Sequence, residues 1–502
     1  MGAFCVLGQG HPTGLASYWT VQLSGGARET SDLFHDLWNG SIAGLLFCHT
    51  NTVFVGARPQ ALKTEGNWHM ARNLILGGLA VVVGGAVGFG LYAYKSPIDP
   101  ITTAQLDEFT PEEVEKGRVL ASAGYCATCH TAADGEPYAG NYAMETGFGT
   151  LYSTNLTPDV ETGIGTYSKE AFRRAMHEGV DREGRHLFPA FPYDHFTKMT
   201  DEDVDAIYAY IMTEVEPVKT VQKENELPFP LNQRILQAGW KMLFVDQGRY
   251  EADEDHSEEW NRGAYLAEGL THCGACHTPR NAVGAEKQSE QYAGAEIDRW
   301  IAPALTATNP SSVAWTAPEF KSYLMEGVTS YHGIAAGPMG PVVHEGVRDL
   351  PESDIDSLAI YLADQVGATD DDPAQSEVVL ASLRNNRPDP QYRRELGERL
   401  YATACASCHY NAEQIMQGRP DLGINSATNL ETPNNLIHVI LDGVNGPEGM
   451  AGVVMPGFRN ALDDEQVAAV SAYLRDKRAN RPAWPELTAT VADIRENGPK
   501  TH

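Results

Sequence analysis

A strongly apolar, uncharged stretch of 21 residues, rich in valine, leucine and glycine, runs from Leu74 to Tyr94. A helix of about 20 apolar residues spans the hydrocarbon core of a membrane. Basic residues precede the stretch and an acidic chain follows it, so the positive-inside rule places the N-terminus in the cytoplasm. We predict a transmembrane anchor over residues 72–95, with a cleaved signal peptide as the alternative.

The residues before the anchor follow no clear apolar period. Residues 1–69 are rich in glycine, threonine and asparagine, and Met70 offers a second start just before the anchor. We interpret residues 1–69 as an uncertain N-terminal extension. It either results from a mispredicted start or forms a small cytoplasmic segment.

Beyond the anchor, apolar positions recur at intervals of three and four in three similar segments, 201–210, 352–361 and 464–473. Each segment begins with acidic residues, which suit the first turn of a helix, and each ends in a tyrosine. Three shorter segments carry a glycine followed three residues later by a leucine, at residues 117, 263 and 397. The pattern predicts a mostly α-helical chain with an internal repeat in three copies.

Length and net charge limit the classes of function that the chain can have. The chain has 502 residues, enough for several domains. Its formal net charge of −30 argues against a nucleic-acid partner, which would need basic patches. An acidic surface favours solubility and would steer a basic protein partner.

Each copy of the repeat contains one C-x-x-C-H motif, and the motifs begin 147 and 132 residues apart. This pattern is typical of covalent haem c attachment, in which two thiols bond the haem and the adjacent histidine binds its iron. A thiol-redox or half-zinc site would explain one copy but not three. We predict three covalently bound haem c groups, attached through Cys126, Cys129, Cys273, Cys276, Cys405 and Cys408 and bound through His130, His277 and His409.

The second axial ligand of a haem in electron-transfer cytochromes is often a methionine, which raises the reduction potential. Met455 is followed by Pro-Gly-Phe in the third copy, and Met339 is flanked by Gly-Pro on both sides in the second. We predict both as ligands, with Met450 as the rival of Met455.

The first copy differs, because Phe191 occupies the position where the other copies have methionine. Phenylalanine cannot bind iron. His195 and Met199 lie close by in the sequence, and we favour His195 over Met199, with a vacant site as the third alternative.

The layout resembles the class I cytochrome c fold, in which the first and last helices cross at a small residue and an aromatic one. The expected fold class is mostly α, with three tandem class I cytochrome c domains behind one N-terminal transmembrane helix. The domains are expected at 106–217, 257–366 and 391–478. We expect the bridge 218–256 to pack between domains and the acidic bridge 367–390 to be an exposed linker.

Several segments together resemble the tri-haem cytochrome c subunit of bacterial membrane-bound dehydrogenases. They are Thr154–Asp159, Gly163–Gly165, Pro189–Tyr193, Arg262–Leu266, Cys273–Arg280 and Gly337–Met339. The group includes alcohol, aldehyde and gluconate dehydrogenase cytochromes, and cytochromes paired with molybdenum hydroxylases that act on aldehydes or N-heterocycles such as nicotinate. The Phe-Pro-Tyr loop at 191–193 and the segments Leu227–Leu231 and Gly239–Trp240 are more similar to the molybdenum hydroxylase branch.

The resemblance implies a partner and a location. Electrons would come from a dehydrogenase catalytic subunit (a molybdenum hydroxylase, quinoprotein or flavoprotein) and pass to ubiquinone or a terminal oxidase of the respiratory chain. The chain would lie in the bacterial inner membrane with its haem domains in the periplasm. The sequence carries no Ser-His-Asp set, P-loop or dinucleotide fingerprint, so we do not expect catalysis by this chain alone. The alternatives are a haem enzyme of the peroxidase or thiosulfate-oxidising type with an open first haem, or a stand-alone electron carrier.

Overall fold

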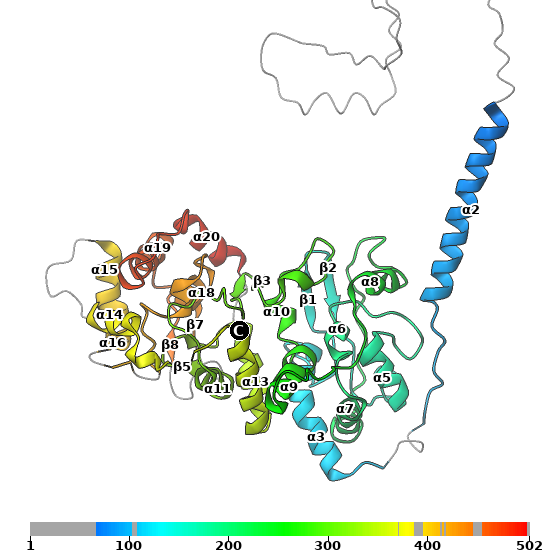
Figure 1. Cartoon of the computed structure of the whole chain (residues 1–502), viewed down its shortest axis with the longest axis horizontal. Helices are drawn as coiled ribbons and strands as arrows, with labels where there is room; N and C mark the ends of the chain where they lie inside the picture. The colour runs from blue at the N-terminus through cyan, green and yellow to red at the C-terminus, as the bar shows by residue number, and fades with distance from the viewer. Residues whose placement is uncertain are drawn as a thin grey trace, which may run out of the picture. The chain divides into compact units, whose positions relative to one another are not determined.

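The computed structural model describes residues 67–102, 108–369, 371–385, 395–411, 414–415, 418–444 and 454–498. Nearly all of the predicted extension 1–69 therefore lies outside the described residues. The chain divides into two units, Met1–Leu76 and Gly77–His502. The described part of the second unit is mostly helical, as predicted, with four two-stranded antiparallel hairpins among the helices (Figure 1).

The apolar stretch forms one helix, α2, over Asn67–Ala93. Within it, the 22 residues Arg72–Ala93 have a mean hydropathy of 2.2, and none of their most apolar window is buried. By length and composition α2 can cross a membrane. The predicted apolar helix is therefore present, and its insertion in a membrane stays a prediction.

The opening and closing segments of the repeat form three helix pairs. They are α3 (Pro111–Ala123) with α7 (Asp201–Glu214), α9 (Glu258–Tyr265) with α13 (Glu352–Gln365), and α15 (Leu396–Leu400) with α19 (Asp464–Tyr473). Side-chain caps explain several of these helix starts. Thr110 and Glu113 form a reciprocal capping box on α3, and Thr200 accepts a hydrogen bond from the Asp203 amide at the start of α7.

A glycine lies at each helix crossing. A Cβ atom at Gly117 would lie 1.8 Å from the carbonyl oxygen of Ala206, so any larger residue would push the helices apart. The same crossing recurs at Gly263 and at Gly397, where the Cβ atom would lie 2.0 Å from a carbonyl oxygen of the closing helix. The recurring spacing of glycine and helix in the sequence thus reflects one packing arrangement used three times.

The remaining elements are short and fill the space between the helix pairs. The strands are β1 (Ala143–Thr146), β2 (Gly149–Tyr152), β3 (Ala295–Ile297), β4 (Trp300–Ala302), β5 (Val328–Thr329), β6 (Gly333–Ile334), β7 (Gly443–Val444) and β8 (Met455–Pro456). The other helices are α4 (Cys126–His130), α5 (Lys169–Glu178), α6 (Tyr193–Phe196), α8 (Leu236–Phe244), α10 (Gly274–His277), α11 (Ala317–Glu326), α12 (Met339–His344), α14 (Glu377–Asn385), α16 (Ala406–His409), α17 (Ser426–Asn429), α18 (Asn434–Asp442) and α20 (Leu487–Asn497). Single π-helical turns, η2 (Leu266–Leu270), η6 (Tyr401–Cys405) and η7 (Leu474–Arg478), extend α9, α15 and α19.

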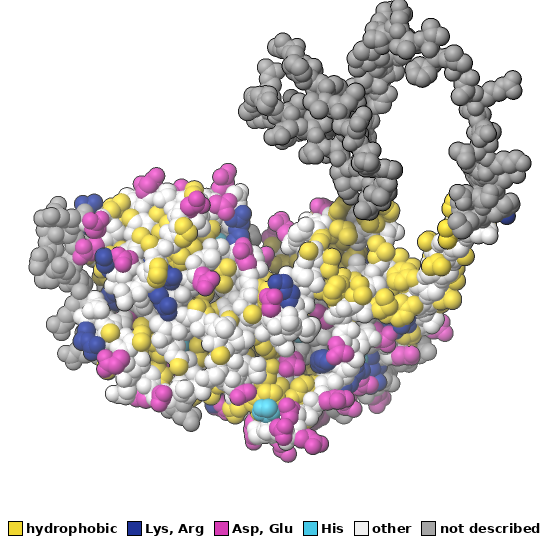
Figure 2. All heavy atoms as spheres, turned by 45° about the horizontal axis from the view of Figure 1, so that its top comes forward, with side chains coloured by type: hydrophobic (Ala, Val, Ile, Leu, Met, Phe, Trp, Pro, Cys, Tyr) yellow, Lys and Arg dark blue, Asp and Glu magenta, His cyan; other side chains and the backbone are white. Residues whose placement is uncertain are grey.

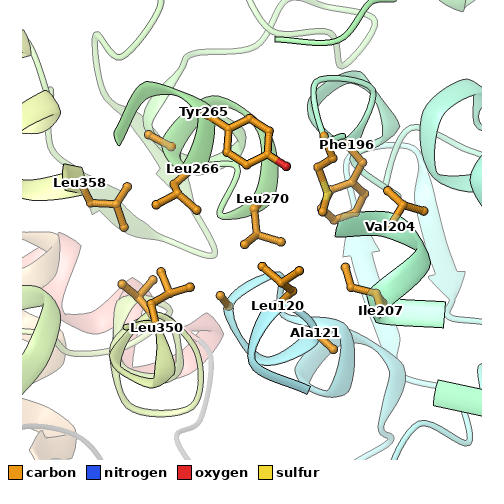
Figure 3. Close-up of a cluster of buried hydrophobic side chains, with 14 of the residues drawn as sticks. Leu120, Ala121, Phe196, Val204, Ile207, Tyr265, Leu266, Leu270, Leu350 and Leu358 are labelled. Atoms are coloured by element: carbon orange, nitrogen blue, oxygen red, sulfur yellow. The ribbon is translucent and has the colours of Figure 1, made fainter. Parts of the chain in front are cut away.

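The first two copies of the repeat share one hydrophobic core. Leu120 of α3, Leu270 of η2 and Leu350 before α13 belong to the same buried cluster, and Figure 3 shows their side chains pointing toward one another. The third copy has a separate buried cluster, which includes Ile437 of α18 and Val491 of α20. The chain is therefore packed as a fused pair of repeats and a third repeat.

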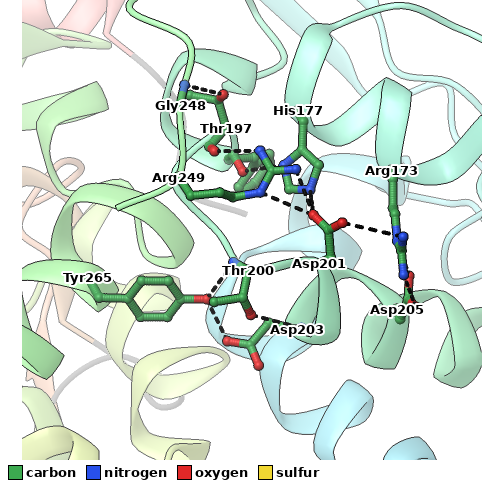
Figure 4. Close-up of polar contacts among 11 residues, drawn as sticks. Arg173, His177, Thr197, Thr200, Asp201, Asp203, Asp205, Gly248, Arg249 and Tyr265 are labelled. Atoms are coloured by element: carbon green, nitrogen blue, oxygen red, sulfur yellow. Dashed lines mark hydrogen bonds and ion pairs between the residues drawn. The ribbon is translucent and has the colours of Figure 1, made fainter. Parts of the chain in front are cut away.

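A polar network also joins the first two copies (Figure 4). Asp201, at the start of α7, accepts a 2.6 Å hydrogen bond from Arg249 of the bridge 218–256. Arg249 holds the pKa of Asp201 below its ordinary value. The hydroxyl of Tyr265 in α9 donates to Asp203 of α7 at 2.5 Å and accepts from the Thr200 amide at 3.2 Å.

The two bridges differ from each other less than we expected. Trp240 in the first bridge packs edge-on against Tyr193 and donates a hydrogen bond to the Val283 carbonyl, which confirms that it packs between the first two copies. The prediction of an exposed second linker is wrong for α14, because Val379 is buried and Ser382 donates a buried hydrogen bond to Asp421. Because the bridge begins with acidic residues, we overlooked the apolar face of helix α14 that follows them.

Candidate haem-attachment sites

Each C-x-x-C-H motif lies on a short helical turn that follows an opening helix, at α4, α10 and α16. All six motif cysteines have free thiols. Burial raises the pKa of the Cys126 thiol to about 12 and the pKa values of Cys276 and Cys405 to about 11. Protonated, buried thiols are poor nucleophiles, so the local environment does not favour a thiol-redox site.

The three motif histidines make the same hydrogen bond. The Nδ1 atom of His130 lies 2.6 Å from the Thr154 carbonyl oxygen, that of His277 lies 2.7 Å from the Pro303 oxygen, and that of His409 lies 3.1 Å from the Pro420 oxygen. A carbonyl oxygen can only accept, so Nδ1 carries the proton in each ring.

This bond leaves the Nε2 atom unprotonated and aims it away from the carbonyl. Burial also lowers the pKa of His130, His277 and His409, which favours the neutral imidazole. Iron is bound by neutral imidazole, and a backbone acceptor on the other nitrogen fixes the tautomer and the ring orientation. The donor set therefore fits haem c at all three motifs.

A backbone loop supports the first two histidines. The amides of Gly140 and Gly294 donate 2.7 Å hydrogen bonds to the carbonyl oxygens of His130 and His277. Both glycines have positive φ, +78° and +88°, which explains why glycine stands there. Our sequence reasoning missed these residues, although the triplet Tyr-Ala-Gly that ends at each glycine is a repeat that could have revealed them.

The first two motifs lie next to each other. Tyr125 and His272, the residues directly before Cys126 and Cys273, both have positive φ, and their rings lie 5.9 Å apart. The Tyr125 hydroxyl is buried, and it has no hydrogen-bond partner among the described residues. Burial, and next the nearby thiols of both motifs, raise its pKa well above the ordinary value. No sequence pattern indicated this contact, because the two positions carry different residues.

The sequence predicted loops around both methionine ligands, but the structure places each of them at the start of a short element. Met339 is the first residue of α12, half-buried, two residues after Gly337, which has a φ of +56° and lies against the Trp300 ring. Met455 is half-buried in β8 and pairs with Val444 of β7. Iron binding by either stays a prediction, and the rival Met450 lies outside the described residues.

His195 lies against the second motif, at the contact between the first two copies. Its Nδ1 atom is 2.8 Å from the Glu268 carbonyl oxygen, and its Nε2 atom is 2.8 Å from a carboxylate oxygen of Glu286. Its Cε1 atom would lie 3.0 Å from a Cβ atom at Gly274, within the second motif. Both ring nitrogens are thus engaged, so binding of the first haem iron by His195 would require one of these hydrogen bonds to break.

The other residues of this loop are packed in the core. Met199 is completely buried in the cluster shared by the first two copies, and the Phe191 ring lies 5.4 Å from the Phe196 ring. Packing in this core is therefore enough to explain a methionine at position 199. Its predicted alternative role as an iron ligand stays untested.

Comparison with protein families agrees with this geometry. The cytochrome c family model matches residues 114–214 and 395–477, which contain the first and third motifs.

Curated relatives match most of the chain. A nicotinate dehydrogenase subunit of Pseudomonas putida is 44% identical over 85% of this chain. This chain spans only 36% of that longer protein. The fructose dehydrogenase cytochrome subunit of Gluconobacter japonicus is 36% identical over 79% of this chain and 86% of its own length. The gluconate 2-dehydrogenase cytochrome c subunit of Pantoea cypripedii is 34% identical over 78% of this chain and 91% of its own length.

Proposed function

The chain belongs to the cytochrome c subunits of bacterial dehydrogenases, and from this premise we propose that it carries electrons through three covalently bound haem c groups. The observation that carries the proposal is the identical histidine–carbonyl hydrogen bond at all three motifs. The haems would supply one-electron chemistry. The chain's own residues hold each proximal imidazole neutral, exclude water and set the distances between sites.

The haem count is directly measurable. The intact mass of the purified chain should exceed the mass of the polypeptide by three haem groups, and a pyridine haemochrome assay should give the same ratio. Two haems would contradict the three-domain arrangement over 106–217, 257–366 and 391–478.

In this proposal His130, His277 and His409 would each bind one haem iron, and Met339 and Met455 would also bind the second and third irons. For the first iron, His195 or Met199 remain the proposed ligands. The first copy has Phe191 where the other copies have a methionine. This difference also supports a second candidate function, a haem enzyme that uses an open first iron. The spin state of the irons distinguishes these two functions. A protein with only low-spin irons would support electron transfer, and a high-spin fraction would support catalysis.

Electron exchange between the first two haems would be direct. The contact of Tyr125 with His272 and the shared buried cluster support a close approach of the two attachment segments. The third haem would exchange electrons across the contact in which the Trp300 ring stacks on the His438 ring, with centroids 4.6 Å apart.

The proposed partner is a dehydrogenase catalytic subunit, and the relative named for nicotinate dehydrogenase favours a molybdenum hydroxylase over a quinoprotein or flavoprotein. The acceptor would be ubiquinone or a terminal oxidase. Helix α2 would anchor the chain in the bacterial inner membrane, with the haem region in the periplasm.

A further inference from the structure

Helix α8 (Leu236–Phe244) turns its charged side chain toward the protein interior and apolar side chains toward the surface. Its only charged residue, Lys241, is buried. The Lys241 ammonium donates hydrogen bonds of 2.5 and 3.0 Å to the carbonyl oxygens of Glu178 and Gly179 at the end of α5, and it lies over the Tyr193 ring. The Lys241 amine therefore satisfies carbonyl oxygens at the C-terminus of α5 and does not face solvent.

The opposite face of α8 is apolar and exposed. Met242 is 60% exposed and Leu243 is 69% exposed. Ile235 and Leu236, seven residues earlier, are also exposed. Residues seven apart lie on one face of a helix. A helix at a water-facing surface normally turns its polar side outward, so this face is built for an apolar environment.

The end of α2 lies across this same face. A Cβ atom at Gly239, which stands between Leu236 and Leu243 on the helix, would lie 3.4 Å from the Phe89 ring of α2. The carbonyl of Ala93, the last residue of α2, accepts a 2.8 Å hydrogen bond from His186 Nε2. The apolar surface of α8 is thus continuous with that of α2, and Figure 2 shows hydrophobic side chains gathered over this part of the surface.

We propose that the exposed face of α8 rests in the lipid surface of the membrane that α2 enters, so that α2 crosses the bilayer and α8 lies along it. The proposal rests on the anchoring role given to α2 above. Tyr92 and Tyr94 are exposed at the end of α2, where aromatic residues mark the boundary between hydrocarbon and water. Helices with one apolar face bind this boundary in the plane of the membrane.

Lipid photolabelling of the full-length holoprotein tests the placement. The chain is reconstituted in vesicles of phosphatidylethanolamine and phosphatidylglycerol that contain a diazirine-tagged phospholipid, and labelled peptides are identified by mass spectrometry. We expect label in α2 and in the peptide that contains Leu236 and Leu243. The peptide that contains Val160, which is 58% exposed and belongs to neither helix, should stay unlabelled.

The outcomes separate this proposal from the anchor itself. Label in α2 without label in α8 overturns the α8 proposal and leaves the anchor intact. Label in neither helix overturns the anchor as well. Equal label in α8 and around Val160 indicates random collision and also rejects the proposal.

A variant identifies the side chains responsible. The double substitution Leu236→Ser and Leu243→Ser changes two exposed residues, so the fold and the haem content should be retained. We expect labelling of α8 to fall several-fold while labelling of α2 is unchanged, and Val160→Ser should change neither. Cross-linking in native membranes gives a further test. If α8 cross-links to another protein and not to lipid, the proposal is overturned in favour of a protein partner.

Discussion

At the scale of single residues, the histidine of each C-x-x-C-H motif is held by one hydrogen bond to a backbone carbonyl. The bond fixes which nitrogen carries the proton, and burial keeps the ring neutral. The copies also differ at the position of the proposed second ligand, where the first copy has Phe191 and the other two have a methionine.

Replacing Met455 by alanine tests the distal assignment in the third copy. We expect all three haems to stay attached, because the cysteines and His409 are unchanged. One iron should become high-spin or titrate at a lower potential, since the soft thioether favours reduced iron. Visible spectra and a potentiometric titration measure this. Met242→Ala, at an exposed methionine, is the control, and an unaltered titration of Met455→Ala would remove Met455 as a ligand.

Replacing His195 by glutamine tests its role at the contact of the first two copies. Loss of the charged hydrogen bond to Glu286 should lower the free energy of unfolding by about 2 kcal/mol, whichever residue binds the first iron. His256→Gln, which breaks an exposed pair with Asp253, should cost less than about 1 kcal/mol. A changed spectrum or potential of one haem in His195→Gln would instead support iron binding by His195.

The same pair predicts a pH dependence. Burial opposes the charge on His195, but the hydrogen bond and charge of Glu286 outweigh burial and raise the pKa of His195 to about 9, from 6.5. The folded-state pKa is the higher one, so this stabilisation is fully present below pH 6.5 and is lost as the pH rises through about 9. Unfolding measured from pH 6 to 10 should lose this component in the wild type and not in His195→Gln. Identical pH profiles would contradict the ion pair.

The candidate haem-attachment residues could be proposed from the sequence because C-x-x-C-H places both cysteines and the histidine within five adjacent positions. The carbonyl oxygens of Thr154, Pro303 and Pro420 could not, because every residue carries the same acceptor. The hydrogen bonds that engage His195 also left no trace in the sequence, since Glu286 is 91 residues away along the chain.

At the scale of elements, the repeated glycine is the determinant of each helix crossing. Gly117 in α3 lies directly against the backbone of α7, and the closing helix adds Tyr210 on the same side. The close approach buries backbone against backbone, which only a residue without a side chain allows.

Substitution of Gly117 by alanine should therefore destabilise the first copy. The added methyl group meets a carbonyl oxygen that cannot move without shifting α7, and overpacking of this kind costs about 1–3 kcal/mol. Thermal unfolding followed by circular dichroism measures the loss. Gly147→Ala is the matched control, because nothing lies within 4 Å of a Cβ atom at Gly147. Equal stability of the two variants would refute the crossing geometry.

The closing helices could be predicted from acidic starts and a period of three to four. Helices α14 and α20 could not, because α14 follows an acidic run and α20 follows the last repeat, where no matching copy drew attention. The apolar face of α8 was visible in composition, but its exposure depends on the inward position of Lys241, which only the fold establishes.

At the scale of the whole molecule, the first two repeats share a core and the third has its own. The two clusters predict two unfolding transitions. Leu270→Ala, in the shared core, should lower the stability of one transition by about 3 kcal/mol, and Ile437→Ala, in the third repeat, should lower the other by a similar amount. Both side chains are fully buried. Calorimetry resolves the transitions, and a single transition shifted equally by both variants would contradict the division.

The central claim is that this chain is the electron-transfer subunit of a dehydrogenase complex. The most direct test is its purification in mild detergent from native membranes, with co-purifying proteins identified by mass spectrometry. The account predicts a stoichiometric dehydrogenase catalytic subunit in the complex, with a molybdenum hydroxylase as the expected type. Recovery of the fully haem-loaded cytochrome alone would contradict the claim and favour a free carrier or a haem enzyme.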